Sequence, residues 1–206
     1  MTNKIKLNLS EDNCCEGNCG CGEQKTLKPL MEDSREDCGC AKEDKGCGCG
    51  HTINQLVIDF LFLDLTQCLR CQNTESTLET SLEEIKAVLQ SADYEVILNK
   101  IHINSLEEAI KYEFESSPTI RVNGKDVISK TLESSCQECG DLCGGEVDCR
   151  DWEFQGVRYT EPPKAMIMNA IFKAIYVPES LPERSNNYSV PNNIIHFFDQ
   201  IKNKNN

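Results

Sequence analysis

The number and grouping of the cysteines constrain this chain more than any other feature of its sequence. There are 14 cysteines among 206 residues, and they lie in closely spaced clusters. A secreted protein would use so many as a disulfide framework, but the first ten residues contain no apolar run suited to a secretory signal. Thiols clustered this closely in a reducing compartment more often bind metal or exchange disulfides. We therefore expect a cytoplasmic protein whose chemistry is that of its thiols.

The charge of the chain excludes several classes of partner. Its net charge of -13 argues against a nucleic-acid partner, because phosphate binding needs clustered Lys and Arg residues. The same charge argues against an anionic membrane surface. No run of about 20 apolar residues occurs, so we expect no transmembrane helix.

Residues 1–50 are predicted to be a tail that cannot fold by itself. They hold eight cysteines and no aromatic residue, and so cannot bury enough apolar surface. In a CxC pair the two sulfurs point to the same side of an extended backbone, so one soft ion can contact both. The tail resembles a metallothionein-like scavenger, although a disordered tail with incidental cysteines is the alternative. The candidate ligands are Cys14, Cys15, Cys19, Cys21, Cys38, Cys40, Cys47 and Cys49.

Residues 51–177 have the pattern of a globular α/β domain. The near-continuous apolar run 56–65 predicts a strand covered on both faces. Apolar periodicity then predicts helices after residue 71, around residues 106–110 and after Pro163. Strands are predicted at 94–103, 119–122 and 152–159. The residues predicted to be buried are Leu78, Leu82, Ile85 and Leu89 in the first helix and Ile167, Ala170, Ile171, Ala174 and Ile175 in the last. Asn123-Gly124 is a hairpin turn, and we expect strand 152–159 to pair with strand 119–122. Residues 131–149 are polar and cysteine-rich and are predicted to be an inserted loop. The predicted order is β-α-β-α-β-β-α.

The last region, 178–206, is predicted to be a linker that ends in a short amphipathic helix. Ile194, Phe197, Phe198 and Ile201 fall on one helical face. A helix this short is not stable alone, so the apolar face must be buried. We expect it to dock on the parent domain, with exchange into a partner subunit as the alternative.

The pair Cys68-Leu69-Arg70-Cys71 directly follows the first strand, and Ser117-Pro118-Thr119 begins the third. This arrangement resembles the thioredoxin superfamily over residues 54–177. The resemblance implies a thioredoxin-like sandwich in which a cis Pro118 faces the two cysteines. The segment Cys149-Arg150-Asp151-Trp152 further resembles a cysteine-rich thioredoxin-like family of prokaryotes. Gln67 replaces the aromatic residue of ordinary thioredoxin and no proline separates the cysteines, so the resemblance does not extend to general reduction of protein disulfides.

The CxxC pair is the candidate reactive site. A helix N-terminus and a nearby cation lower the pKa of a thiol, and we expect Cys68 to lie at such an N-terminus with Arg70 as the cation. Cys68 is then the attacking thiol and Cys71 the resolving one, with Pro118 opposite them. The alternative is a pair of inert thiols beside a strand end.

A second cysteine group lies between the third strand and the last helix. Four thiolates within fourteen residues can satisfy a tetrahedral Zn²⁺ or another soft metal ion. A redox relay with the CxxC pair, an iron–sulfur cluster and inert thiols are the alternatives. The group consists of Cys136, Cys139, Cys143 and Cys149.

Two functions follow from these patterns. The first is a thiol–disulfide oxidoreductase that acts on a protein or small-molecule disulfide, is restored by a reductant partner, and is coupled to soft-metal handling. The second is a non-enzymatic protein that binds, delivers or detoxifies a soft ion such as Zn²⁺, Cu(I), Hg²⁺ or trivalent arsenic. Neither function calls for an organic cofactor.

Overall fold

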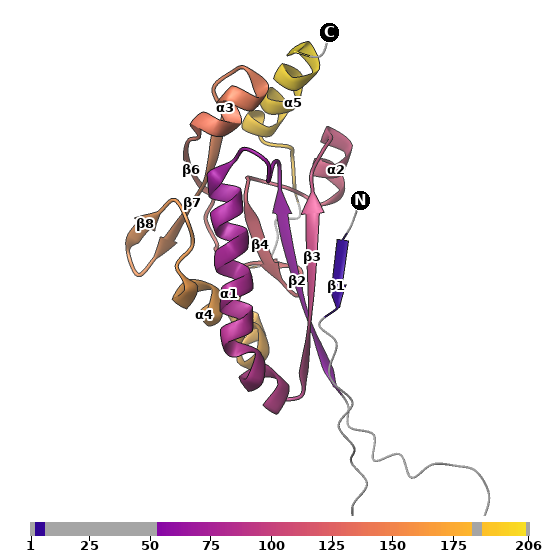
Figure 1. Cartoon of the computed structure of the whole chain (residues 1–206), viewed down its shortest axis with the longest axis vertical. Coiled ribbons are helices and arrows are strands. Elements are labelled where there is room, and N and C mark those ends of the chain that lie inside the picture. Colours follow the sequence, from indigo (N-terminus) through magenta and orange to yellow (C-terminus); the bar gives the residue numbers. More distant parts are fainter. Residues whose placement is uncertain (1–2, 7–52, 183–186, 205–206) are drawn as a thin grey trace, which may run out of the picture. The chain divides into compact units, whose positions relative to one another are not determined.

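The computed structural model describes residues 3–6, 53–182 and 187–204. This part of the chain is mixed α/β, with two sheets, five α-helices and one short 3-10 helix (Figure 1). The strands are β1 (Asn3–Lys6), β2 (Asn54–Phe62), β3 (Tyr94–His102), β4 (Thr119–Val122), β5 (Lys125–Asp126), β6 (Leu132–Ser135), β7 (Asp148–Phe154) and β8 (Val157–Tyr159). The helices are α1 (Leu69–Ser91), α2 (Leu106–Lys111), α3 (Gln137–Cys143), α4 (Lys164–Tyr176), the 3-10 helix η1 (Pro178–Ser180) and α5 (Asn192–Lys204).

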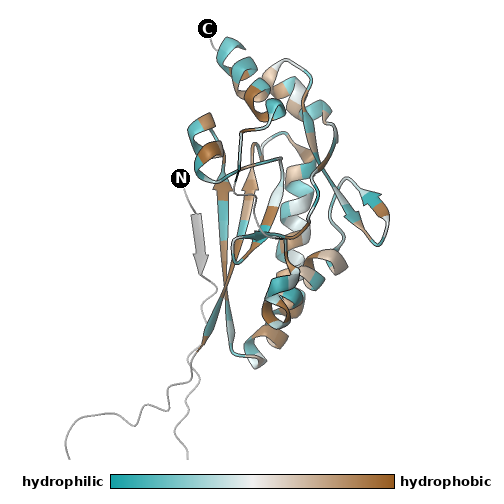
Figure 2. Cartoon of the chain, turned by 180° about the vertical axis from the view of Figure 1, so that it is seen from behind, coloured by the Kyte–Doolittle hydropathy of each residue, from teal (hydrophilic) through white to brown (hydrophobic). Residues whose placement is uncertain are grey.

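The larger sheet has the strand order β1-β3-β2-β4-β5. Its centre is β2, which runs parallel to β3 and antiparallel to β4. Leu56, Ile58 and Phe60 of β2 are fully buried, which explains why this strand is a nearly continuous apolar run. Figure 2 shows the hydrophobic residues along these strands from the other side. β1 pairs with the outer edge of β3 and was not predicted from the sequence.

Helices α1 and α4 contact each other and pack on the larger sheet (Figure 1). The predicted buried face of α1 is confirmed, because Leu78, Leu82, Ile85 and Leu89 are all buried. α4 begins directly after Pro163, as predicted. On α4 four of the five residues predicted to be buried are buried, and the fifth, Ile175, is only partly buried. Met166, which was not predicted, is also buried.

The fourth strand of the larger sheet is not the one that the sequence predicted. β5 follows the Asn123-Gly124 turn at once and pairs with β4. Both turn residues have positive φ, 49° at Asn123 and 79° at Gly124, as a tight hairpin requires. Because β5 already occupies the edge of β4, residues 152–159 cannot pair there. They instead contribute to β7 and β8, which form a hairpin in the second sheet.

The prediction of an inserted loop at residues 131–149 is also wrong. These residues form β6, α3 and the start of β7, and β6 pairs with β7. The helix is only seven residues long, so it is too short to show an apolar period. We call residues 132–154, from the start of β6 to the end of β7, the cysteine-bearing segment.

The C-terminal helix α5 docks on the domain, as expected. Ile194 and Phe197 are buried, and α5 lies against α3 (Figure 1). Lys204 Nζ donates to the carbonyl oxygens of Asp141 and Leu142 in the last turn of α3. At the other end of the helix, Asn193 Nδ2 donates to Asp148 O at 2.7 Å. α5 therefore contacts the cysteine-bearing segment through both of its ends, at the start of β7 and at the last turn of α3.

Within residues 3–6, 53–182 and 187–204, no helix is long and apolar enough to cross a membrane.

The docking of α5 predicts that Phe197 contributes strongly to stability. Truncating a fully buried phenylalanine removes its packing and leaves a cavity, so Phe197→Ala should lower the free energy of unfolding by about 3–5 kcal/mol. Ile195, which lies on the exposed side of the same helix, is the matched control. Ile195→Ala should change stability by less than about 0.5 kcal/mol. Chemical denaturation measures both, and equal stabilities of the two variants would show that α5 is not docked in solution.

Candidate metal centre

A tight loop after β2 places Cys68 at the start of α1. The Asp64 carboxylate is its centre, because Oδ1 accepts hydrogen bonds from the backbone N–H groups of Gln67 at 2.6 Å and Cys68 at 3.2 Å. Cys68 is the N-cap of α1, and its Sγ accepts from the N–H of Cys71 at 3.4 Å. The predicted position of Cys68 at a helix N-terminus is therefore confirmed.

The cysteine-bearing segment brings three further thiols to the same place. Cys136 is the N-cap of α3, Cys139 lies in the first turn of that helix, and Cys149 is on β7. Cys136 N donates to Val147 O at 2.8 Å, which ties the start of α3 to the beginning of β7. Gly144, with φ 83°, ends α3 in the left-handed conformation and turns the chain back toward β7.

Four thiols therefore converge, and we call them the thiol quartet: Cys68, Cys136, Cys139 and Cys149. Their Sγ atoms all lie within 4.8 Å of one another, and each residue exposes 2% or less of its surface. The Sγ atoms of Cys68 and Cys136 are 3.9 Å apart, and those of Cys139 and Cys149 are 3.3 Å apart. One tetrahedral ion with metal–sulfur bonds of about 2.3 Å holds its sulfurs about 3.8 Å apart. The quartet could hold one metal ion with little rearrangement.

The quartet differs from the ligand set that the sequence predicted, because Cys68 takes the place of Cys143. Cys143 lies four residues beyond Cys139, about 6 Å further along the axis of α3. Its Sγ contacts the carbonyl oxygens of Gly140 at 3.7 Å and Gly145 at 3.8 Å. Cys143 is thus a buried thiol with its own partners, outside the candidate metal centre.

Cys71 is fully buried beside the quartet but does not belong to it. Its Sγ lies 3.3 Å from Ser117 Oγ, which in turn accepts from Leu63 N at 3.1 Å. Ser117 precedes Pro118 at the start of β4, and the peptide bond between them is cis, as the thioredoxin resemblance implied. The structure therefore brings Cys71 and the residue before Pro118 into contact.

The contacts of Arg70 are with the second sheet, and the predicted effect of its charge on Cys68 stays a prediction. Its guanidinium donates to the Asp151 carboxylate at 3.0 Å and to backbone carbonyl oxygens of the cysteine-bearing segment. The charge is already paired by Asp151, whose side chain is almost completely buried. Arg70 is therefore a link between α1 and the second sheet.

Hydrogen bonds among the thiols shift their pKa values in opposite directions. The hydrogen bond from Cys136, followed by those from Cys139, Cys149 and Cys71, lowers the pKa of Cys68 well below that of a free thiol. The pKa of Cys136 is also lowered, chiefly by its hydrogen bonds with Cys139 and Cys149. The hydrogen bond with Cys136 is the largest cause of the raised pKa of both Cys139 and Cys149.

Cys71 has a raised pKa, first because of its hydrogen bond to Cys68 and then because of burial. Cys68 therefore accepts hydrogen bonds from the neighbouring thiols, and these favour its thiolate form. A metal ion that binds all four sulfurs displaces the shared protons.

Cys136 is the member of the quartet nearest to an open surface. It borders a hollow of about 550 Å³ that is also lined by Asp141 and Glu146. Its Sγ donates to Glu138 Oε2 at 3.4 Å, and that side chain is half-buried. Cys136 is therefore the quartet residue that lines this hollow.

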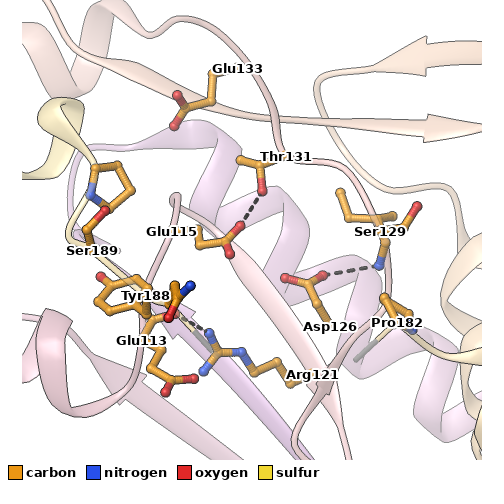
Figure 3. Close-up of a pocket in the computed structure, with 13 residues that line it drawn as sticks. Glu113, Glu115, Arg121, Asp126, Ser129, Thr131, Glu133, Pro182, Tyr188 and Ser189 are labelled. Carbon is orange, nitrogen blue, oxygen red and sulfur yellow. Dashed lines mark hydrogen bonds between the residues drawn. The ribbon is translucent and has the colours of Figure 1, made fainter. Parts of the chain in front are cut away.

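A second hollow, of about 390 Å³, has a different character (Figure 3). Acidic side chains converge on it, and no cysteine is among the described residues that line it. Thr131 Oγ1 donates to Glu115 at 2.6 Å, and Arg121 donates to the carbonyl oxygens of Tyr112 and Glu113. These side chains already have partners within the fold, so we assign no ligand to this hollow.

The remaining predicted ligands lie outside the described residues. They are Cys14, Cys15, Cys19, Cys21, Cys38, Cys40, Cys47 and Cys49.

Among the residues of the site, the role of Asp64 was missed by sequence reasoning. It is the last acidic residue before the CxxC, at a spacing that allows its carboxylate to cap the following N–H groups. The sequence singles out Ser117 only as the residue before Pro118. Its contact with Cys71 spans 46 residues, and no local pattern reports a contact of that kind.

The fold and the site define an α/β protein with a buried four-cysteine centre. By sequence, the chain belongs to the family described as "Domain of unknown function (DUF2703)", which matches residues 56–171. The matched region contains the whole quartet together with Cys71 and Cys143, and excludes the cysteines of residues 1–50. Comparison with curated proteins and with solved structures found no match.

Proposed function

We propose that residues 54–176 form a thioredoxin-like domain into which the cysteine-bearing segment is inserted. Three observations support this. A parallel β2-α1-β3 unit is followed by an antiparallel β4-β5 hairpin in the order β3-β2-β4-β5. The CxxC pair begins α1 directly after the loop that follows β2. Ser117, at the start of β4, contacts Cys71.

We further propose that the protein binds a soft metal ion at the thiol quartet. The observation that carries this proposal is the convergence of four buried Sγ atoms within 4.8 Å of one another. Thiolates select soft ions such as Zn²⁺, Cu(I), Hg²⁺ or trivalent arsenic. The compact spacing favours a single ion, since a cluster of several irons would hold the four sulfurs farther apart.

The burial of all four ligands indicates binding rather than hydrolytic catalysis. A catalytic zinc keeps an open position for water, whereas a closed tetrahedral site has none. The function proposed here is therefore to hold, deliver or detoxify a soft ion in the cytoplasm. The eight cysteines of residues 1–50 would contribute a metallothionein-like tail that captures such ions.

Metal content tests this assignment directly. Full-length protein with Cys139→Ser, purified without oxygen and loaded with zinc, should bind about one equivalent less than the parent, because a closed site needs all four thiolates. Cys143→Ser removes a buried thiol of the same helix that lies outside the quartet, and should bind as much as the parent. If Cys143→Ser loses the ion and Cys139→Ser keeps it, the proposed ligand set is wrong.

Thiol–disulfide exchange is the second candidate function, and the position of Cys71 favours it. The Cys68 thiolate would attack a disulfide, forming a mixed disulfide and releasing one thiol. Cys71 would then attack Cys68 Sγ, closing a Cys68–Cys71 disulfide and releasing the second thiol. A reductant partner would supply two electrons and two protons to restore the pair. Because Cys68 also belongs to the quartet, this oxidation removes one ligand of the ion.

A small disulfide fits this reaction better than a protein disulfide. Cys68 and Cys71 are both buried, and the cysteine-bearing segment covers them. Arg150 N on β7 donates to Ser117 O at 2.7 Å. The backbone carbonyl of the residue that contacts Cys71 is therefore already hydrogen-bonded to β7. A polypeptide substrate could reach Cys68 only after this segment moved.

The redox candidate predicts that Cys71 promotes loss of the ion under oxidation. A small disulfide added to zinc-loaded protein should release zinc from the quartet, and Cys71→Ser should release it much more slowly, because the resolving thiol of the CxxC pair is missing. Cys143→Ser should behave like the parent. A chromophoric zinc indicator follows the release, and equal rates for Cys71→Ser and the parent would remove the redox role.

A further inference from the structure

We infer that Arg70 is the positioning residue that assembles the metal centre. The inference rests on the proposed metal-binding function and assigns a role to a residue that contacts no ion itself. Arg70 lies between Cys68 and Cys71 in the first turn of α1. Its guanidinium reaches across to the end of β6, which leads into Cys136, and to β7, which carries Cys149.

The contacts of Arg70 converge on the backbone of the cysteine-bearing segment. Nη2 donates to Ser135 O at 2.8 Å, directly before Cys136. Nη1 lies 3.3 Å from Cys149 O, the carbonyl of a quartet residue. Nη1 also contacts Ser134 Oγ at 3.0 Å. One side chain on the turn that follows Cys68 therefore fixes the backbone at two of the other three ligands.

Asp151 holds the guanidinium in this position. Its Oδ1 accepts from Arg70 Nη1 at 3.0 Å and from Ser134 Oγ at 2.8 Å, and its side chain is almost completely buried. Because the guanidinium of Arg70 contacts Asp151 and backbone carbonyl oxygens, we assign it a geometric role at the quartet. The planar fork of an arginine can donate in two directions at once, which a lysine ammonium on a flexible stem cannot reproduce.

Arg158 supplies a matched control. It pairs with the same Asp151 carboxylate, through Oδ2 at 2.6 Å, and donates to Glu133 O. The side-chain partners of Arg158 are thus in the same strands as those of Arg70, but none is a cysteine or the residue before one. A variant at Arg158 therefore removes one partner of the buried Asp151 carboxylate. It leaves in place the hydrogen bonds of Arg70 to the backbone at Cys149 and before Cys136.

The test measures zinc affinity and the cobalt spectrum of full-length Arg70→Gln, Arg70→Lys and Arg158→Gln. Cys139→Ser is measured alongside to subtract the ion held by other cysteines. Loss of a group that orients ligands typically weakens a metal site about 10- to 100-fold. We expect Arg70→Gln to lose affinity by that factor, Arg70→Lys to lose part of it, and both to alter the Co²⁺ thiolate bands. Arg158→Gln should keep the parent spectrum and affinity.

The possible results separate this inference from the proposed function. If the parent binds no more ion than Cys139→Ser, the metal-binding proposal itself fails. If the parent binds the ion and Arg70→Gln matches Arg158→Gln in affinity and spectrum, only the role of Arg70 fails. Should Arg70→Gln not fold, as judged by thermal melting of the metal-free protein, Arg70→Lys decides: parent-like affinity and spectrum overturn the inference, and weakened binding with altered bands supports it.

Discussion

The convergence of four buried thiols from two distant parts of the chain is the constraint on which the rest of the site depends. Cys68 and Cys136 are 68 residues apart in sequence, yet their sulfurs are 3.9 Å apart. Ionisable groups are buried at a cost unless hydrogen bonds or a metal compensate them. Here Arg70, Asp151 and α5 hold the cysteine-bearing segment against the start of α1, so the thiols reach one another and remain shielded from water.

The same convergence relates the two candidate functions. Cys68 is at once the first cysteine of the CxxC pair and a member of the quartet. It can bind an ion with three partners or form a disulfide with Cys71, but one sulfur cannot do both. With its cysteines reduced, the structure places the Cys68 sulfur among the thiols of the cysteine-bearing segment. The closed geometry supports our proposal that metal binding is the main function, and we propose oxidation as a route to release of the ion.

Local features of the fold could be predicted from the sequence, and long-range ones could not. The buried face of α1, the Asn123-Gly124 turn and the helix start at Cys68 each follow from neighbouring residues. The pairing of β7 with β6 depends on which edge of the larger sheet is already occupied, and no local pattern reports that. Cys143 was predicted as a ligand in place of Cys68 for a similar reason. The segment that forms α3 was predicted to be a loop, and a loop allows any spacing of ligands, whereas a helix places Cys143 away from Cys139.

Anomalous diffraction from crystals of the zinc-loaded, fully reduced protein tests the central claim most directly. We expect one zinc peak surrounded by the Sγ atoms of Cys68, Cys136, Cys139 and Cys149, each about 2.3 Å away. Cys143 and Cys71 should stay outside that sphere. A zinc ion bound by Cys143 in place of Cys68, or no zinc among these four sulfurs, would contradict the account.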